Sequence, residues 1–564
     1  MVTRGVAAVA AGVAAGVAVG LAAGYWLRRS HSLLRLRLRL LSATTRTVVL
    51  CNVNVPVALL PSPLATGLSQ DAEGLVLCNV SLCDGKVHSV TPARPPTRRL
   101  RHGAIDLRGA ICAGCWVDSH THLVKTHAHP RTRNPTGSIS DALAVELDDQ
   151  PRWAACACCR PIAFSGKGGA ASMSADGDAA PSPCPRATDV ARRMEFAIAT
   201  AYHHGARAIR THLDGTASPD AKLRATVYAA FASCRERWAK KGVVLQGVAN
   251  LYLPLWRDWE LAQRHVEEAM RHDGVLLGAY CGNVADTPPA ETVGALDALF
   301  GYARLHDVQV DLHIDETNDP RCCCLLSLVN ALGRARARGY AREVLLGHCT
   351  ALALQSAPTR REVIDGLRGL APVTVVCNPS TNLGLQDRRG SAPPHCTPID
   401  ATAARTPMWR GLTLVQELCR AGVAVGAASD NVRDYWHPYG DYDGLEVWRL
   451  ATTLGQLDSA PCEGAWAHLV SDSPAAAMGA SPSPSGAAFD AGAAADLIVF
   501  PDARRISELF SRPQCERVVL RRGRVQESRL PCYSELDDLV QTASTLTVDR
   551  ATVLRGASAM DPRP

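Results

Sequence analysis

Between residues 114 and 470, short apolar runs rich in β-branched residues alternate with segments of helical periodicity. The runs predict buried strands, and apolar positions three or four residues apart predict helices. The predicted strands are residues 117–123, 207–213, 243–249, 275–279, 308–313, 343–348, 374–377 and 423–428. The predicted helices are residues 190–204, 221–240, 259–272, 291–305, 326–341 and 409–421. This alternation favours a (β/α)8 TIM-like barrel, with a doubly wound sheet as the alternative.

Strand-like runs also occur at both ends of the chain. They are residues 48–55, 76–80 and 86–90, and then 496–500 and 517–520, with a hairpin signal at Asp84-Gly85. We therefore expect residues 47–113 and 490–530 to build one small β-sandwich-like domain beside a barrel of residues 114–470. Residues 154–187 have the composition of a flexible insertion, 471–495 that of a linker, and 531–564 form a C-terminal tail.

Residues 1–46 have the composition of an anchor or targeting segment. Residues 5–27 are apolar and flanked by arginines, and a bilayer span needs about 20 such residues. The heavier positive flank lies after the run, which would place the body of the chain on the cytosolic side of a membrane. An Arg-rich segment without acids equally favours an organelle transit peptide. A cleaved secretory signal is less favoured because the apolar run is long.

Composition excludes some classes of protein. The net charge of +6 comes largely from the amino terminus, because no acidic residue precedes Asp71. The balanced remainder does not indicate a nucleic-acid binder. The 21 cysteines are scattered or adjacent, as in Cys322-Cys323-Cys324, unlike a secreted disulfide framework. We therefore expect a reducing compartment.

Polar residues recur at the carboxyl ends of the predicted strands, where barrel active sites lie. They are His120 and His122 on the first strand, His212 on the second, His313 on the fifth, His348 on the sixth and Asp430 after the eighth. A single histidine at a strand end is more often structural than a ligand. Several at equivalent positions of one barrel instead indicate a shared site.

The residue types suggest roles around one metal ion. His120, His122 and His313 can supply nitrogen ligands and Asp430 an oxygen, which leaves a coordination position for water. A bound ion lowers the pKa of that water, so hydroxide is available near neutral pH. Glu316, three residues after His313, can take the proton and return it to the leaving group, with Asp315 as a competitor. His348 can hydrogen-bond the oxygen that enters the substrate.

These residues lie in motifs that match a known family in order and at barrel spacing. The motifs include His120-Thr-His122-Leu, Arg210-Thr-His212-Leu-Asp214, Asp311-Leu-His313-Ile-Asp-Glu316, Gly347-His348-Cys-Thr350 and Ser429-Asp430-Asn431-Val432 with Trp436. From about residue 47 to 525 the chain resembles the cytosine deaminase branch of the amidohydrolase superfamily. The resemblance implies one divalent ion, Fe²⁺ or Zn²⁺, held by His120, His122, His313 and Asp430. It also implies Glu316 as proton shuttle, His348 beside the attacking oxygen, His212 supporting the ligands, and Asn431 and Trp436 lining a pyrimidine pocket.

The family reaction replaces the exocyclic amine of cytosine with water, giving uracil and ammonia. The chain departs from that pattern where the ring is read. Val124-Lys125 follows the His-x-His-Leu motif, where the family usually has an aspartate. Tyr252 stands where the family has a glutamine that reads the amide edge of the ring, and Asn431 replaces a second aspartate. We therefore expect metal-dependent deamination, most readily of cytosine. Changes at the residues that read the ring can shift the substrate, so the prediction of deamination is stronger than that of cytosine.

Two alternatives remain open. One is hydrolysis of another cyclic C–N bond, of the amino-triazine, isocytosine or creatinine type. The other is a membrane-tethered barrel that binds a ligand or metal without catalysis, although the retained Glu316 argues against it. For the catalytic reading we expect a small nucleobase-like substrate, no nucleic-acid partner, possible membrane contact through residues 5–27, and a homo-oligomer.

Overall fold

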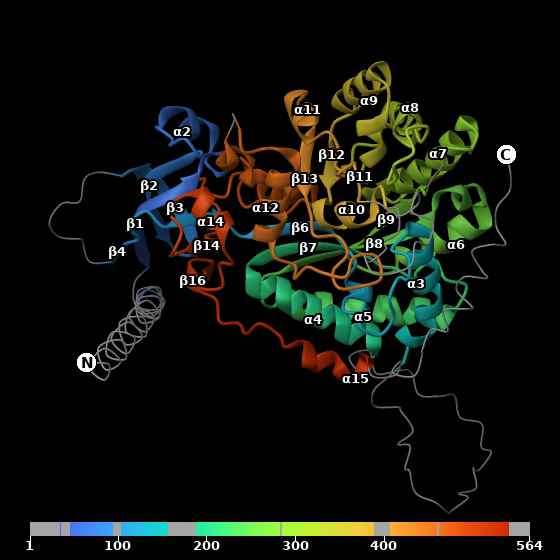
Figure 1. Cartoon of the computed structure of the whole chain (residues 1–564), viewed down its shortest axis with the longest axis horizontal. Helices are drawn as coiled ribbons and strands as arrows, with labels where there is room; N and C mark the ends of the chain where they lie inside the picture. Colours follow the sequence, from blue (N-terminus) through green and yellow to red (C-terminus); the bar gives the residue numbers. More distant parts are fainter. Residues whose placement is uncertain are drawn as a thin grey trace, which may run out of the picture.

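The computed structural model describes residues 34, 46–93, 103–155, 188–282, 285–388, 406–459 and 462–540 (Figure 1). Eight parallel strands form one sheet in the order β13-β12-β11-β10-β9-β8-β7-β6. Their bounds are β6 (Trp116–Thr121), β7 (Ala206–His212), β8 (Val244–Tyr252), β9 (Val275–Tyr280), β10 (Val310–Ile314), β11 (Val344–His348), β12 (Val373–Cys377) and β13 (Ala424–Ala427). One further parallel bridge joins Thr121 to Asp430 at the seam between the first and last strands. The sheet is thus a nearly closed (β/α)8 barrel, and the predicted fold class is confirmed.

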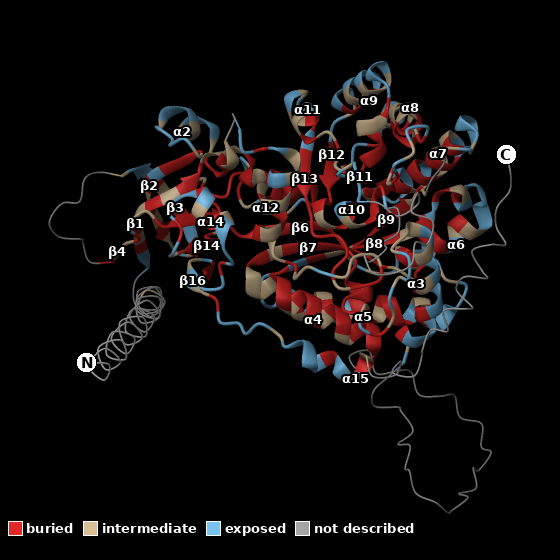
Figure 2. Cartoon of the chain, viewed as in Figure 1, coloured by how far each residue is buried: buried red, intermediate tan, exposed pale blue. Residues whose placement is uncertain are grey.

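Helices surround the barrel, and the strands inside are buried (Figure 2). The longer helices are α3 (Ile139–Trp153), α4 (Asp189–His204), α5 (Ala221–Ala239), α6 (Trp259–Ala269), α7 (Pro289–Leu305), α8 (Cys324–Ala337), α9 (Ala357–Gly369) and α12 (Gly444–Gly455). Short helices include α10 (Pro379–Leu385) and α11 (Val415–Arg420). Strands β10, β11 and β12 are buried at every position, as parallel strands covered by helices require. The pattern of the sequence did not predict α3, α9 or α12, and α11 is shorter than predicted.

Both ends of the chain build a second, separate sheet at one end of the barrel (Figure 1). Its strands are β1 (Thr47–Pro56), β2 (Leu75–Cys83), β3 (Lys86–Pro92), β4 (Ala104–Asp106), β5 (Ile111–Gly114), β14 (Leu497–Phe500), β15 (Val518–Arg521) and β16 (Arg524–Val525). Strands β14 and β5 pair antiparallel, which joins the two ends. Asp84 and Gly85 form the β2–β3 turn with positive φ, as their hairpin signal predicts. The exact domain boundaries stay a prediction.

Residues 471–495 are better packed than their linker-like composition suggests. They contain α13 (Asp472–Ala477), whose Ala475 packs with Val117 and Ala208 near the starts of β6 and β7. Phe489 and Ala493, further along, are fully buried. Small residues allow this close packing, and their abundance resembles the composition of a linker.

The predicted membrane-anchored location is corrected. Among the residues that the structure describes, no helix is long and apolar enough to cross a bilayer. Residues 5–27, on which that prediction rested, lie outside the described part of the chain. Most of the predicted insertion, residues 156–187, and the end of the predicted tail, residues 541–564, also lie outside it.

Candidate active site

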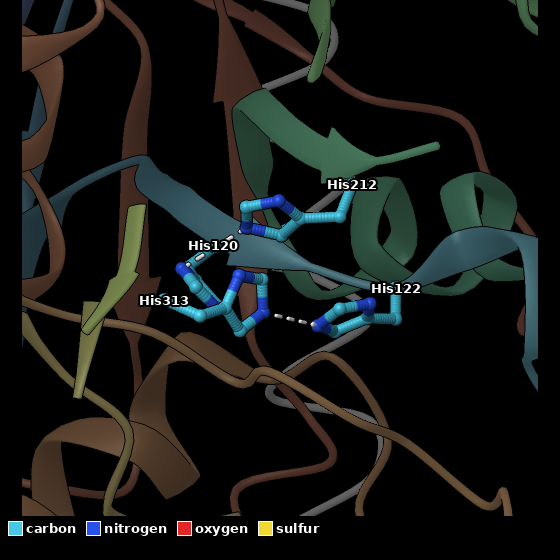
Figure 3. Close-up of side chains that lie close together, drawn as sticks. All are labelled: His120, His122, His212 and His313. Carbon is cyan, nitrogen blue, oxygen red and sulfur yellow. Dashed lines mark hydrogen bonds between the residues drawn. The ribbon is translucent and has the colours of Figure 1, made fainter. Parts of the chain in front are cut away.

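The barrel brings the predicted polar residues to one end of the sheet. His120 lies on β6 with His122 just after it, His212 ends β7, His313 lies on β10, and His348 ends β11. Asp430 follows β13, and the Thr121–Asp430 bridge sets it beside β6. The rings of His120, His122, His212 and His313 turn toward one another (Figure 3). Gly347 leaves room for this cluster, because a Cβ there would lie 2.5 Å from Cε1 of His120.

Four of these side chains converge closely. Nε2 of His122 lies 3.1 Å from Nε2 of His313 and 3.3 Å from Oδ1 of Asp430. Nε2 of His120 lies 3.7 Å from the same Asp430 oxygen. The ligand atoms of His120, His122, His212 and His313 lie within 4.8 Å of one another, as do those of His120, His348 and Asp430. The structure therefore places the four predicted ligands together, with two further imidazoles beside them.

The bonding around this cluster fits a cation. Nε2 of His120 and both carboxylate oxygens of Asp430 are buried without a hydrogen-bond partner among the described residues. An unpaired buried carboxylate is costly unless a positive charge lies beside it. Burial lowers the pKa of His120, His122 and His313 well below the usual value, which keeps the imidazoles neutral. Neutral imidazole is the form that binds metals, so this donor set suits one divalent ion.

Neighbouring side chains orient the imidazoles. Nδ1 of His122 donates to Oδ2 of Asp214 at 2.9 Å, which leaves its Nε2 lone pair facing the cluster. Nε2 of His212 lies 3.2 Å from Nδ1 of His120, and Nδ1 of His212 lies 2.8 Å from the Asn250 side-chain amide. His212 therefore contacts a predicted ligand, as expected of a supporting residue.

Glu316 and His348 form a second pair at the cluster. Oε1 of Glu316 lies 3.4 Å from Nδ1 of His348, and the Asn382 amide lies 3.1 Å from the same nitrogen. Burial raises the pKa of Glu316 to about 8 and lowers that of His348 to about 3. The competitor Asp315 accepts hydrogen bonds from the backbone N–H groups of Cys324 and Leu325 at the start of α8. Asp315 thus has structural partners, and of these two neighbouring residues Glu316 is the one that lines the cavity.

A cavity of about 150 Å³ opens onto the cluster. It is lined by His122, Lys125, Leu143, Glu146, Asp214, Asn250, Tyr280, His313, Glu316, His348, Asp430, Asn431 and Trp436. The predicted pocket residues Asn431 and Trp436 are in this wall. Tyr252 is not: its side chain is 44% exposed, and Asn250 and Tyr280 line the cavity nearby.

Sequence reasoning missed two charged residues of the wall. Nζ of Lys125 lies 2.9 Å from Oε2 of Glu146 and 3.4 Å from Oδ2 of Asp214. The Trp436 indole N–H donates to the same Glu146 oxygen at 2.7 Å. The sequence did contain an indication for Lys125, because Val124-Lys125 directly follows the first histidine motif, where the chain departs from the resembled family. Glu146 lies in no motif, and its helix was not predicted.

Comparison with known proteins agrees with this geometry. The model of the amidohydrolase family matches residues 275–526. The chain is 35% identical over 493 residues to a pterin deaminase from Rhizobium rhizogenes, an alignment that covers 87% of this chain and 96% of that protein. The chain belongs to the metal-dependent amidohydrolase superfamily, in its deaminase branch. This amidohydrolase is thus a hydrolytic deaminase, and its buried His/Asp cluster is able to bind a metal ion.

Solved structures share the fold of this amidohydrolase. The 5-methylcytosine deaminase from Klebsiella pneumoniae matches with a TM-score of 0.62 at 21% identity, over 86% of this chain and 98% of that one. N-isopropylammelide isopropylaminohydrolase from Burkholderia multivorans matches with a TM-score of 0.57 at 19% identity, over 85% of this chain and 98% of that one. At these identities the similarity concerns the barrel and its companion sheet rather than a substrate.

Proposed function

We propose that this amidohydrolase removes the exocyclic amine of a pterin-type ring, giving the corresponding oxo compound and ammonia. The observation that carries this proposal is the 35% identity to a pterin deaminase over 96% of its length. The pyrimidine half of pterin is an isocytosine ring, so the proposal includes one alternative raised by the sequence. Cytosine itself has weaker support, because the structural similarity to a 5-methylcytosine deaminase is at 21% identity. Tyr252, Lys125 and Asn431 also depart from the cytosine pattern.

His120, His122, His313 and Asp430 would hold Fe²⁺ or Zn²⁺. Such an ion, when bound, supplies the Lewis acidity that makes water a nucleophile near neutral pH. The rest of the chemistry falls to the chain. Glu316 lies in the cavity wall beside the cluster and can accept a proton from water and deliver it to the substrate. Because burial raises the pKa of Glu316 to about 8, this carboxyl group can carry a proton at physiological pH.

His348 would assist as a neutral hydrogen-bonding group. Burial lowers its pKa to about 3, so the ring stays uncharged over the working pH range. The side-chain amides of Asn378 and Asn382 lie 3.3 and 3.1 Å from its Nδ1 and fix the ring orientation. A held, neutral imidazole can polarise the entering oxygen without competing with the ligands for the ion. The predicted homo-oligomeric state stays a prediction.

Ammonia release from a panel of substrates tests the proposal. The full chain, loaded with Fe²⁺ or Zn²⁺, is assayed with pterin, isocytosine, cytosine, creatinine and ammelide, and metal-stripped protein serves as the blank. We expect pterin to exceed cytosine in kcat/KM by roughly 100-fold or more, since a site built around one hydrogen-bonding edge rejects rings that lack it. A preference for cytosine would contradict the pterin assignment. Absence of all turnover with metal bound would favour the non-catalytic barrel.

A further inference from the structure

The cavity wall contains a buried charged pair that the proposed chemistry does not use. Lys125 lies just after His122, and Glu146 lies on α3. Both residues are buried, yet both line the cavity. Burial alone would lower the pKa of Lys125, but the carboxylates of Asp214 and Glu146 outweigh it and raise that pKa above its usual value. Lys125 is therefore an ammonium group inside the substrate cavity.

Glu146 is held in place through one of its two oxygens. Oε2 accepts from Nζ of Lys125 at 2.9 Å and from the Trp436 indole N–H at 2.7 Å. Among the described residues, Oε1 has no hydrogen-bond partner. The two bonds hold Oε2, and because Glu146 lines the cavity, Oε1 is left available as an acceptor for a ligand there.

Lys125 supplies the complementary donor. An ammonium group has three N–H bonds, and the contacts with Glu146 and Asp214 account for two. The third remains for a ligand oxygen. Nζ also lies 5.1 Å from the centroid of the Trp436 ring, whose indole is part of the same wall. A donor and an acceptor thus stand side by side next to an aromatic surface.

We propose that Lys125 and Glu146 recognise the lactam edge of the substrate ring. The ammonium group donates to the ring carbonyl oxygen at C4, and Oε1 of Glu146 accepts from the adjacent ring N3–H. This inference rests on the proposed function, since a pterin-type ring carries that edge next to its amine-bearing carbon. The pair takes over the role that the resembled family gives to a glutamine, because Tyr252 at that position lies outside the cavity wall.

The arrangement also orients the reaction. The amine of pterin is on C2, between N3 and N1. With N3–H and the C4 carbonyl held by Glu146 and Lys125, N1 points away from this pair, and Glu316 lines the same cavity. N1 is the ring nitrogen that accepts a proton as water adds to C2, and Glu316 is the group able to supply it. One ring then contacts the recognition pair and the proton shuttle together.

Equilibrium binding tests this assignment without relying on turnover. In a metal-loaded Glu316→Gln background, which leaves the substrate intact, the affinity for pterin is compared with that for 2-aminopteridine, which lacks the lactam. We expect Glu146→Leu to weaken pterin binding by about 10- to 100-fold, as loss of a hydrogen bond to a charged group does. Binding of 2-aminopteridine should change by less than about 2-fold, because it makes no such bond.

Two further variants make the test specific. Glu146→Gln keeps the shape but has only one oxygen, which the Lys125 ammonium group and the Trp436 indole N–H would occupy. Its NH2 group would then face the ring N3–H, so we expect a loss of pterin affinity of similar size, about 10- to 100-fold. If Glu146→Leu shows no cooperative thermal unfolding transition, or does not retain metal, Glu146→Gln alone serves as the test. Asp148→Asn changes an exposed acid on the same helix and should leave both affinities unaltered.

The outcomes separate this inference from the proposed function. Equal losses for both ligands, or no loss for either, would overturn lactam recognition by Glu146. Pterin binding that depends on Glu146, together with a wild-type protein that releases no ammonia from pterin, would refute the deaminase assignment while supporting the recognition pair. Failure of the Glu316→Gln protein to bind either ligand would overturn both.

Discussion

The chain builds the two sides of its cavity in different ways. The metal side comes from strand ends and the turns just after them, where His120, His313 and Asp430 sit. The other side, called the recognition side after the role we propose for it, contains Glu146 on helix α3, Lys125 in the short 3-10 helix after β6, and Trp436 in the segment after β13. Barrel topology makes the strand ends converge whatever follows them. Loops and added helices vary independently of the barrel, so a conserved reaction can be combined with a changed substrate.

Asp214 belongs to both sides. Its Oδ2 accepts from Nδ1 of His122 at 2.9 Å and lies 3.4 Å from Nζ of Lys125. One carboxylate therefore contacts both the predicted ligand His122 and the proposed recognition residue Lys125. The two sides are built differently but are connected through Asp214. Three substitutions can measure how independently the two sides function.

The largest effect is expected from His313→Ala on the metal side. Removing this imidazole takes away the partner of His122 Nε2 at 3.1 Å, so the protein should lose its ion and all turnover. Metal analysis by mass spectrometry of the purified protein measures the content. His306→Ala, at an exposed position, is the matched control. Unchanged metal content in the first variant would exclude His313 as a ligand.

A smaller and more selective loss is expected from Glu316→Gln. The amide cannot take or return a proton, so kcat should fall by about 10²- to 10⁴-fold. Metal content should stay at the wild-type level, because Glu316 contacts His348 rather than a predicted ligand. Turnover and metal analysis on the same preparation check both statements. Full activity would refute the shuttle role.

The smallest effect is expected from Asp214→Asn, which tests the link between the sides. The neutral amide weakens the hold on His122 and removes one charge beside Lys125, so metal affinity should fall by about 10- to 100-fold. Competition with a chromogenic chelator measures that affinity. An unaltered affinity would mean that His122 keeps its orientation without this carboxylate, and the two sides would then be separable.

Most of the barrel was predictable because its strands are continuous apolar runs that end in polar residues. The prediction of residues 343–348, for example, differs by one residue from β11 (Val344–His348). Helix α3 was not predictable by the same reasoning. Its Leu143 and Leu147 are exposed by 41% and 56%, whereas Glu146 and Asp149 are buried. The buried side of α3 combines these two acidic residues, both in ion pairs, with Ala142 and Trp153. A search for apolar periodicity does not detect such a mixed face.

The site shows the same division. The histidines and Asp430 were found because each ends a recognisable strand. The choice between Asp315 and Glu316 required the structure, because two neighbouring carboxylates cannot be told apart in the sequence. In the structure, Asp315 accepts hydrogen bonds from the start of α8, which identifies it as the structural residue of the two. The position of Tyr252 also needed coordinates. It lies at the last residue of β8, with its side chain 44% exposed, whereas Asn250 two residues earlier lines the cavity.

The Thr121–Asp430 bridge has a consequence for how the protein matures. The predicted ligands His120 and His122 come from the first barrel strand and Asp430 from the turn after the last, so the coordination shell exists only once the ring of strands has closed. A ribosome-bound chain that has not yet released residue 430 cannot offer the complete set. If these residues bind the ion as predicted, its loading would follow closure of the barrel, and the bound ion would link the first barrel strand to the segment after the last.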